Sequence, residues 1–119
     1  MPDTRTYEGG CHCGAVRYTV ETDLSTVIEC NCSHCAKKGF LLTFVTPDKF
    51  ELRTDRAALT EYRFNSRHIG HLFCPACGVQ SFAEGETPDG REMRAVNVRC
   101  LEGVDVSALT ITPVDGASR

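Results

Sequence analysis

The sequence predicts a mainly β fold, a complex antiparallel β-sheet arrangement in one domain that spans residues 1–119. Alternation of apolar and polar residues is the first observation behind this prediction. Val16, Tyr18 and Val20 alternate with polar neighbours, which is the period of a strand with one buried face, and the pattern returns at Ala95–Val98. The second observation is that turn-forming residues divide the chain into segments of strand length. With a hydrophobic content of 41%, the composition is that of an ordinary small domain.

The remaining elements are predicted as short strands with two helical turns among them. The expected strands cover residues 27–30, 40–46, 50–53, 59–64, 69–73 and 79–83. Turn signals such as Pro47-Asp48 and Pro88-Asp89-Gly90 separate them. Residues 33–39 and 55–59 are expected to form the helical turns.

Seven of the eight cysteines fall in three short clusters, Cys11-His-Cys13, Cys30-Asn-Cys32-Ser-His-Cys35 and Cys74-Pro-Ala-Cys77. Cysteines one or two residues apart do not easily bridge each other. Zn–S bonds of about 2.3 Å, in contrast, need sulfur atoms only about 3.7 Å apart. The spacing therefore favours zinc as the cofactor, and a disulfide scaffold is the alternative.

The chain lacks the charged start, apolar core and cleavage site of a signal peptide, and it has no apolar run that approaches the roughly 18 residues needed to span a bilayer. A cytoplasmic location is therefore expected, where thiols stay reduced, and no membrane partner is expected. Thirteen basic and sixteen acidic residues give a formal net charge of −3 without long blocks of either sign. This pattern gives no indication of a nucleic-acid partner. Lys37 and Lys38, with scattered arginines, favour a solvated face over an anion pocket.

Two of the clusters together supply four sulfurs for a closed metal site. Residues i and i+2 of a strand share a face, so Cys11 and Cys13 can point together from the edge of the first strand. Cys74-Pro-Ala-Cys77-Gly78 has the sequence of a zinc-knuckle turn. Four thiolates leave no open coordination position, so Cys11, Cys13, Cys74 and Cys77 are interpreted as a structural zinc site. A site in which the middle cluster shares ligands with the knuckle is the alternative.

The middle cluster supplies three sulfurs. Cys30, Cys32 and Cys35 can hold one face of a zinc ion and leave its fourth position for water, substrate or another residue, as catalytic zinc sites do. Three thiolates weaken the Lewis acidity of the ion, so the site suits a thiol better than an activated water. A thiol held there as a thiolate can attack an electrophilic carbonyl.

The alternative hypothesis is that a fourth ligand from the protein closes the zinc site at Cys30, Cys32 and Cys35. Cys100 is the main candidate, because eight cysteines would complete two four-thiolate sites. His12 and His34 lie within clusters and are further candidates. His68 and His71 are also candidates, but they lie close to the start of a predicted strand and are interpreted as surface or packing residues.

Four segments also carry a family resemblance: Gly9–Tyr18, Cys30–Cys35, Phe73–Gly78 and the strand Ala95–Leu101. Their motifs and order resemble the GFA-like family, whose domain is also called the CENP-V/GFA domain and whose members include glutathione-dependent formaldehyde-activating enzymes. The resemblance covers the chain from Gly9 to about Asp115.

The resemblance implies a mostly antiparallel β fold like that of the Mss-type Rab exchange factors, with two zinc ions. It places the structural zinc on Cys11, Cys13, Cys74 and Cys77, and the active zinc on Cys30, Cys32 and Cys35. The activity ascribed to the family is addition of the glutathione thiol to formaldehyde, giving S-hydroxymethylglutathione, or the reverse cleavage. That reaction is classified as a carbon–sulfur lyase reaction.

The sequence therefore predicts a zinc-dependent carbon–sulfur lyase that acts on an adduct of glutathione or another small-molecule thiol. The predicted catalytic residues are Cys30, Cys32 and Cys35. A non-enzymatic zinc-stabilised interaction module is one alternative, and it requires that both metal sites be closed. A thiol redox or zinc sensor is the other, and it would release zinc under mild oxidant.

Overall fold

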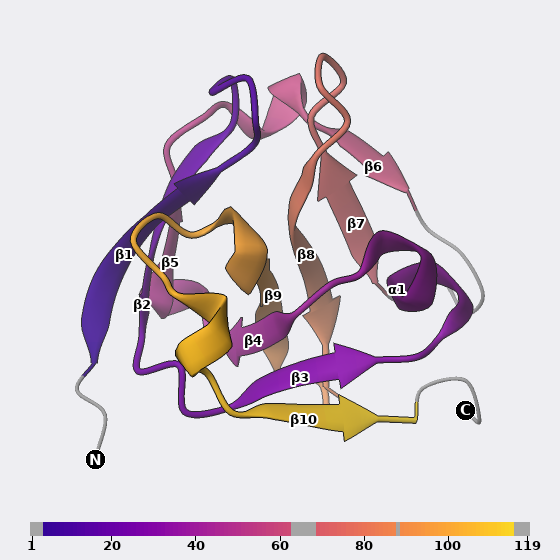
Figure 1. The fold of residues 1–119 in the computed structure, drawn as a ribbon. Coiled ribbons are helices and arrows are strands. Elements are labelled where there is room, and N and C mark those ends of the chain that lie inside the picture. Colours follow the sequence, from indigo (N-terminus) through magenta and orange to yellow (C-terminus); the bar gives the residue numbers. More distant parts are fainter. Residues whose placement is uncertain (1–3, 63–68, 88, 116–119) are drawn as a thin grey trace.

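The computed structural model describes residues 4–62, 69–87 and 89–115, and this part of the chain is mainly β, which confirms the predicted fold class (Figure 1). Ten strands, one short α-helix and four 3-10 helices make up the described residues. Three strands form an antiparallel sheet in the order β1-β2-β5. Their bounds are β1 Arg5–Gly10, β2 Arg17–Thr22 and β5 Phe50–Leu52.

A seven-stranded sheet, in the order β10-β3-β4-β9-β8-β7-β6, lies beside the first one. Neighbouring strands run antiparallel, except that β10 is parallel to β3. The strands are β3 Val27–Cys30, β4 Leu42–Val45, β6 Thr60–Tyr62, β7 Gly70–Phe73, β8 Gln80–Glu86, β9 Glu92–Asn97 and β10 Ile111–Val114. The helix α1 Ser33–Lys38 joins β3 to β4, and the 3-10 helices are Pro47–Lys49, Arg56–Ala58, Val98–Cys100 and Val106–Ala108.

The predicted strands are present with shifts of a few residues at their ends, and both helical turns are present. Gly39 ends α1 in the left-handed conformation, as a glycine after a helix commonly does. Strands β1 and β10 are not among the predicted elements, and neither are the 3-10 helices Pro47–Lys49, Val98–Cys100 and Val106–Ala108. The strand prediction for 63–64 and the turn residue Pro88 lie outside the described residues. No helix of the described chain combines the length and apolar character needed to cross a membrane.

The main core lies between the two sheets. Tyr18 and Val20 of β2 pack against Phe82 of β8 and Val96 of β9. The Tyr18 and Phe82 rings meet edge to face with centroids 5.9 Å apart, and the Tyr18 hydroxyl donates to the carbonyl of Ser81 at 3.3 Å. Burial raises the pKa of Tyr18, so the hydroxyl stays protonated as this donor.

The seven-stranded sheet presents a second, different face away from that core. Because successive strand residues point to opposite faces, the neighbours of Phe82 and Val96 face the other way. In the ladder Ala83 lies opposite Ala95, and Ala95 lies opposite Phe44. His71 of β7 lies opposite Ala83 in the same row. This row of side chains forms part of the candidate site.

Candidate metal centres and the adjoining cavity

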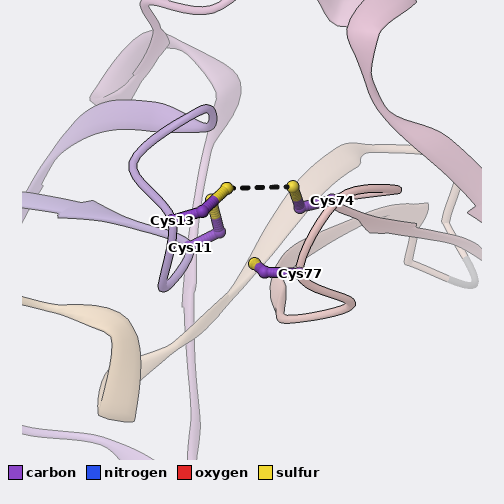
Figure 2. Close-up of side chains that lie close together, drawn as sticks. All are labelled: Cys11, Cys13, Cys74 and Cys77. Carbon is purple, nitrogen blue, oxygen red and sulfur yellow. Dashed lines mark hydrogen bonds between the residues drawn. The ribbon is translucent and has the colours of Figure 1, made fainter.

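Cys11, Cys13, Cys74 and Cys77 converge from two loops, one after β1 and one after β7 (Figure 2). All four Sγ atoms lie within 4.8 Å of one another. The Cys11 and Cys13 sulfurs are 3.6 Å apart, as are those of Cys13 and Cys74. A zinc ion with four sulfur ligands requires separations of about 3.7 Å, so the donor set fits zinc. All eight cysteines are free thiols, which does not support a disulfide scaffold.

The Cys11 and Cys13 sulfurs share a loop, and the prediction that they project from a strand face was wrong. Strand β1 ends at Gly10, and the residues that follow bend back toward β2. Gly14 takes a φ of 85°, a left-handed conformation that glycine adopts without steric cost. The Cys11 amide donates to the Val16 carbonyl at 3.1 Å, and the Val16 amide donates to Cys11 Sγ at 3.3 Å. The loop thus brings the sulfurs together by bending.

Gly10 offers a direct test of this loop. A Cβ atom on Gly10 would lie 2.1 Å from the Val16 carbonyl oxygen, which is fixed by its bond from Cys11. We expect Gly10→Ala to lower the free energy of unfolding by about 3 kcal/mol, because the backbone must move. Gly14→Ala is the matched control: its Cβ meets nothing within 4 Å, so only left-handed strain of about 1 kcal/mol remains. Denaturant titrations measure the free energy of unfolding of both variants. An equal decrease in Gly10→Ala and Gly14→Ala would contradict the proposed clash at Gly10.

The loop that carries Cys74 and Cys77 has the knuckle geometry that its sequence predicts. The Cys74 amide donates to the Val79 carbonyl at 3.1 Å, and the Gly78 amide donates to the Cys74 carbonyl at 2.8 Å. Gly78 has a φ of 79°. The loop therefore closes on itself and directs both sulfurs toward Cys11 and Cys13 (Figure 2).

The thiols of this group have very different pKa values, and this difference favours a bound cation. The backbone amide of Val79, followed by that of Cys13, lowers the pKa of Cys77 to about 6. The Ala15 amide acts in the same direction on Cys13, but the contacts of Cys13 with Cys74 and Cys11 outweigh it and raise its pKa to about 11. Four close thiolates repel one another, so some sulfurs retain protons. A divalent cation can take the place of those protons.

Cys30, Cys32 and Cys35 form a second group around the junction of β3 and α1. Their Sγ atoms also lie within 4.8 Å of one another, and Cys35 is buried. Cys30 ends β3, Cys32 caps the N-terminus of α1, and Cys35 lies in its first turn. The Cys32 amide donates to Cys30 Sγ at 3.5 Å, and the Cys35 amide donates to Cys32 Sγ at 3.4 Å. The three sulfurs fit zinc in the same way as the first group, but with one ligand fewer.

The surroundings of Cys32 and Cys35 shift the pKa values of these two thiols in opposite directions. For Cys32, burial is the largest single effect and opposes ionisation, but the hydrogen bonds from Cys35, Cys30 and the His34 amide together outweigh it and lower the pKa. For Cys35, burial raises the pKa well above its usual range, and the contact with Cys32 adds to the effect. The protein alone therefore holds this group partly protonated, and a cation is needed to make it fully thiolate.

Within the described residues, neither group gains a further cysteine or histidine. Cys100 Sγ lies 3.8 Å from the Gln80 carbonyl, and the residue borders a hollow with Cys11 and His12. His34 packs its ring 4.3 Å from that of His71 and 5.6 Å from that of Phe40. His68 lies outside the described residues. The described part of the chain thus offers no fourth protein ligand to Cys30, Cys32 and Cys35.

A cavity of about 400 Å³ adjoins the second group, and Cys30, Cys32 and Cys35 all border it. Its polar wall includes His71, which the sequence offers as a candidate fourth ligand, together with Gln80 and Asn97, which the sequence analysis does not assign to the site. His71 is 7% exposed, which agrees with a packing residue and not with a surface one, and it also borders this space. Gln80 Nε2 donates to His71 Nδ1 at 3.2 Å, so the neutral ring carries its proton on Nε2. Lys37 and Lys38 are exposed on α1 and do not border the cavity, in line with the solvated-face reading.

The fold and the two sulfur groups define a mainly β protein equipped to bind metal ions through thiolates. The family model described as "Glutathione-dependent formaldehyde-activating enzyme" matches residues 6–112, so the chain belongs to that family. A crystal structure of a Rhodobacter sphaeroides protein, a structural genomics target, superposes with a TM-score of 0.77 at 31% sequence identity. The match covers 89% of this chain and 97% of that one. The family resemblance noted in the sequence is thereby confirmed.

Proposed function

We propose that this protein is a zinc-dependent carbon–sulfur lyase that forms or cleaves the adduct of a carbonyl compound with glutathione or a similar small thiol. The observation that carries the proposal is the three-sulfur group bordering a cavity, with no fourth ligand among the described residues. An open coordination position beside a ligand-sized space is typical of a catalytic metal site. The family to which the chain belongs is named for glutathione-dependent activation of formaldehyde, which is chemistry of this kind.

In this proposal the two sulfur groups have different roles. Cys11, Cys13, Cys74 and Cys77 would hold a structural zinc ion, and Cys30, Cys32 and Cys35 would hold the active one. When bound at the second group, zinc supplies a positive charge that keeps a thiol sulfur ionised at neutral pH. Cleavage breaks the C–S bond with its electron pair left on sulfur, while the hydroxyl proton passes to water and the carbonyl forms. Addition is the reverse.

His71 is the cavity group that we assign to the oxygen of the substrate. Its Nδ1 accepts from Gln80, so its Nε2–H is a hydrogen-bond donor, suited to a carbonyl or hydroxyl oxygen. A donor held in place before the reaction stabilises the oxygen as its charge changes. Its burial keeps the ring orientation fixed.

Removing this donor should slow the reaction without removing metal. We expect His71→Ala to lower kcat by about 100-fold, the scale typical of deleting one donor to a developing oxyanion. Zinc content should stay at two ions per chain, as measured by atomic absorption, because His71 belongs to neither sulfur group. An unchanged kcat would show that His71 does not contact the reacting oxygen.

The proposal is tested by titrating glutathione into the cobalt-substituted protein. An open position can exchange its fourth ligand, so we expect a saturable change in the ligand-field bands of one of the two cobalt ions. Cys100→Ser serves as the control and should behave in the same way, because Cys100 belongs to neither group. Two cobalt ions in unchanging four-sulfur surroundings would instead support the interaction-module reading and overturn the proposal.

A further inference from the structure

We propose that the cavity beside Cys30, Cys32 and Cys35 binds an apolar group on the carbon side of the adduct. The substrate class would then be hemithioacetals formed between a thiol and an apolar aldehyde, with an alkyl or aryl chain where formaldehyde has only hydrogen. This inference rests on the proposed lyase function and specifies the substrate class of the same site.

One wall of the cavity is a row of small and apolar side chains on the outer face of the seven-stranded sheet, with two alanines as its floor and Phe44 at its exposed end. Phe44 on β4 lies opposite Ala95 on β9, and Ala95 lies opposite Ala83 on β8. All three border the cavity. The two alanines leave space above the sheet that larger residues would fill. Ile28 and Leu42, on the neighbouring strands β3 and β4, extend the same apolar surface.

The size of the cavity exceeds what formaldehyde requires. A volume of about 400 Å³ lies within the range of pockets that bind drug-sized ligands. The single carbon of formaldehyde occupies a space comparable to one water molecule, roughly 30 Å³. A chain of several carbons would fill more of this volume and could contact the two alanines.

The solvent-exposed part of the cavity lining is also apolar. Phe44 is 43% exposed and Ile69 is 47% exposed, and these are two of the large exposed apolar side chains in the described chain. Both border the cavity, so an apolar ligand would cover them. No lysine or arginine occurs among the described residues that line it, whereas Glu86 contributes a negative charge. The carboxylates of glutathione are therefore poorly suited to this space.

A second hollow, of about 500 Å³, lies on the other side of the sulfur group and can accommodate the part of the thiol compound beyond its sulfur. Cys30 and Cys35 border both spaces, so the sulfur group lies between them. The second hollow is lined by polar residues that include Asn31 and Asp115, and Asn31 Nδ2 donates to Asp115 Oδ1 at 3.1 Å. Glu29 also lines this hollow and no described lysine or arginine does, so it suits the amino group of glutathione and not the carboxylates. A substrate sulfur held at the cysteines can thus direct its carbon chain into the apolar cavity and its amine-bearing part toward the second hollow.

The reaction balances without an additional reagent. In RS–CH(OH)–R′ the C–S bond breaks and its electron pair stays on sulfur, giving the thiolate. The hydroxyl proton passes to water, and the remaining C–O bond becomes the aldehyde carbonyl. Nothing is oxidised or reduced, and the group R′, which the cavity would hold, is unchanged.

The test compares binding of two stable thioethers, S-hexylglutathione and S-methylglutathione, to the zinc-loaded protein by calorimetry. Each buried methylene strengthens binding by about three- to fourfold, so the hexyl compound should bind at least about 30-fold more tightly. In Ala95→Phe the added ring fills the floor, and the preference should fall below about threefold. Ala108→Phe is the control, because Ala108 is exposed on a 3-10 helix and does not border the cavity. Ile69→Ser, which changes an exposed residue, should weaken the preference even if Ala95→Phe does not fold.

Binding and turnover can fail separately. Equal affinity for the two thioethers would overturn the inference, even if the formaldehyde adduct of glutathione is cleaved. A hexyl preference that survives in both Ala95→Phe and Ile69→Ser would place the apolar site elsewhere and also overturn it. A hexyl preference that both variants reduce would support the cavity assignment, even if no adduct is cleaved and the lyase proposal fails.

Discussion

Cys74→Ser should leave the protein largely unfolded at 37 °C. Cys74 is 1% exposed, and its sulfur lies 3.6 Å from that of Cys13, so the change removes a buried sulfur from the group that we propose holds the structural zinc. Loss of a structural metal is among the few single changes that cost more than about 4 kcal/mol, and a small domain has only about 5–15 kcal/mol in total. Thermal melts followed by circular dichroism, with zinc analysis, measure the effect.

Cys100→Ser is the matched control for that experiment. It changes the same atoms at a cysteine that belongs to neither group, so both zinc ions and a melting temperature close to that of the unmodified protein should be retained. A Cys74→Ser protein that melts within a few degrees of the unmodified chain would contradict the structural role of the four-sulfur group.

Cys32→Ser should abolish turnover and preserve the fold. Serine is a poor zinc ligand but a favourable helix N-cap, and the Cys32 side chain already caps α1 by accepting from the Cys35 amide. The hydroxyl can accept the same bond, so the helix should persist. We expect activity to fall by at least about 1,000-fold, the scale of losing one member of a catalytic unit, with zinc content falling from two ions to one.

The comparison with Cys74→Ser separates the roles of the two groups. The difference in melting temperature between Cys32→Ser and the unmodified chain should be a few degrees at most. If Cys32→Ser unfolds as completely as Cys74→Ser, the second group is structural as well. If Cys32→Ser retains full activity, Cys30, Cys32 and Cys35 do not form the catalytic centre.

The two sulfur groups could be anticipated from the sequence because metal binding by thiolates depends on residue type and local spacing. The bends of the backbone around these cysteines could not be predicted from the sequence. The bend at Cys11 and Cys13 depends on the left-handed conformation of Gly14 and on the contact with Val16, neither of which a strand pattern reveals. Strand β1 ends in two glycines and β10 contains Pro113, residues that disfavour strands, and pairing with neighbouring strands stabilises both.

The cavity could not be anticipated because it depends on strand register. His71 faces it only because β7 pairs with β8 so that His71 lies opposite Ala83. A shift of one residue would turn His71 to the other face of the sheet. Alternation within β7 identifies two faces, but the sequence alone does not say which one borders the cysteines. The positions of Gln80 and Asn97 beside the cavity depend on strand register in the same way, so the sequence does not assign them to the site.

The contact between Cys13 and Cys74 joins residues that are 61 positions apart in the chain. Closing a flexible loop of that length costs about 3.6 kcal/mol of chain entropy beyond a constant, so an ion held by one cysteine pair in the unfolded chain gains little from the other. We therefore expect the four sulfurs to come together only after the sheets have brought both loops into contact. Interactions completed after the folding transition state slow unfolding more than they speed folding. An ion bound at this site should therefore mainly slow unfolding. Refolding rates should depend little on the concentration of free zinc, whereas loss of the bound ion should shorten the lifetime of the native state.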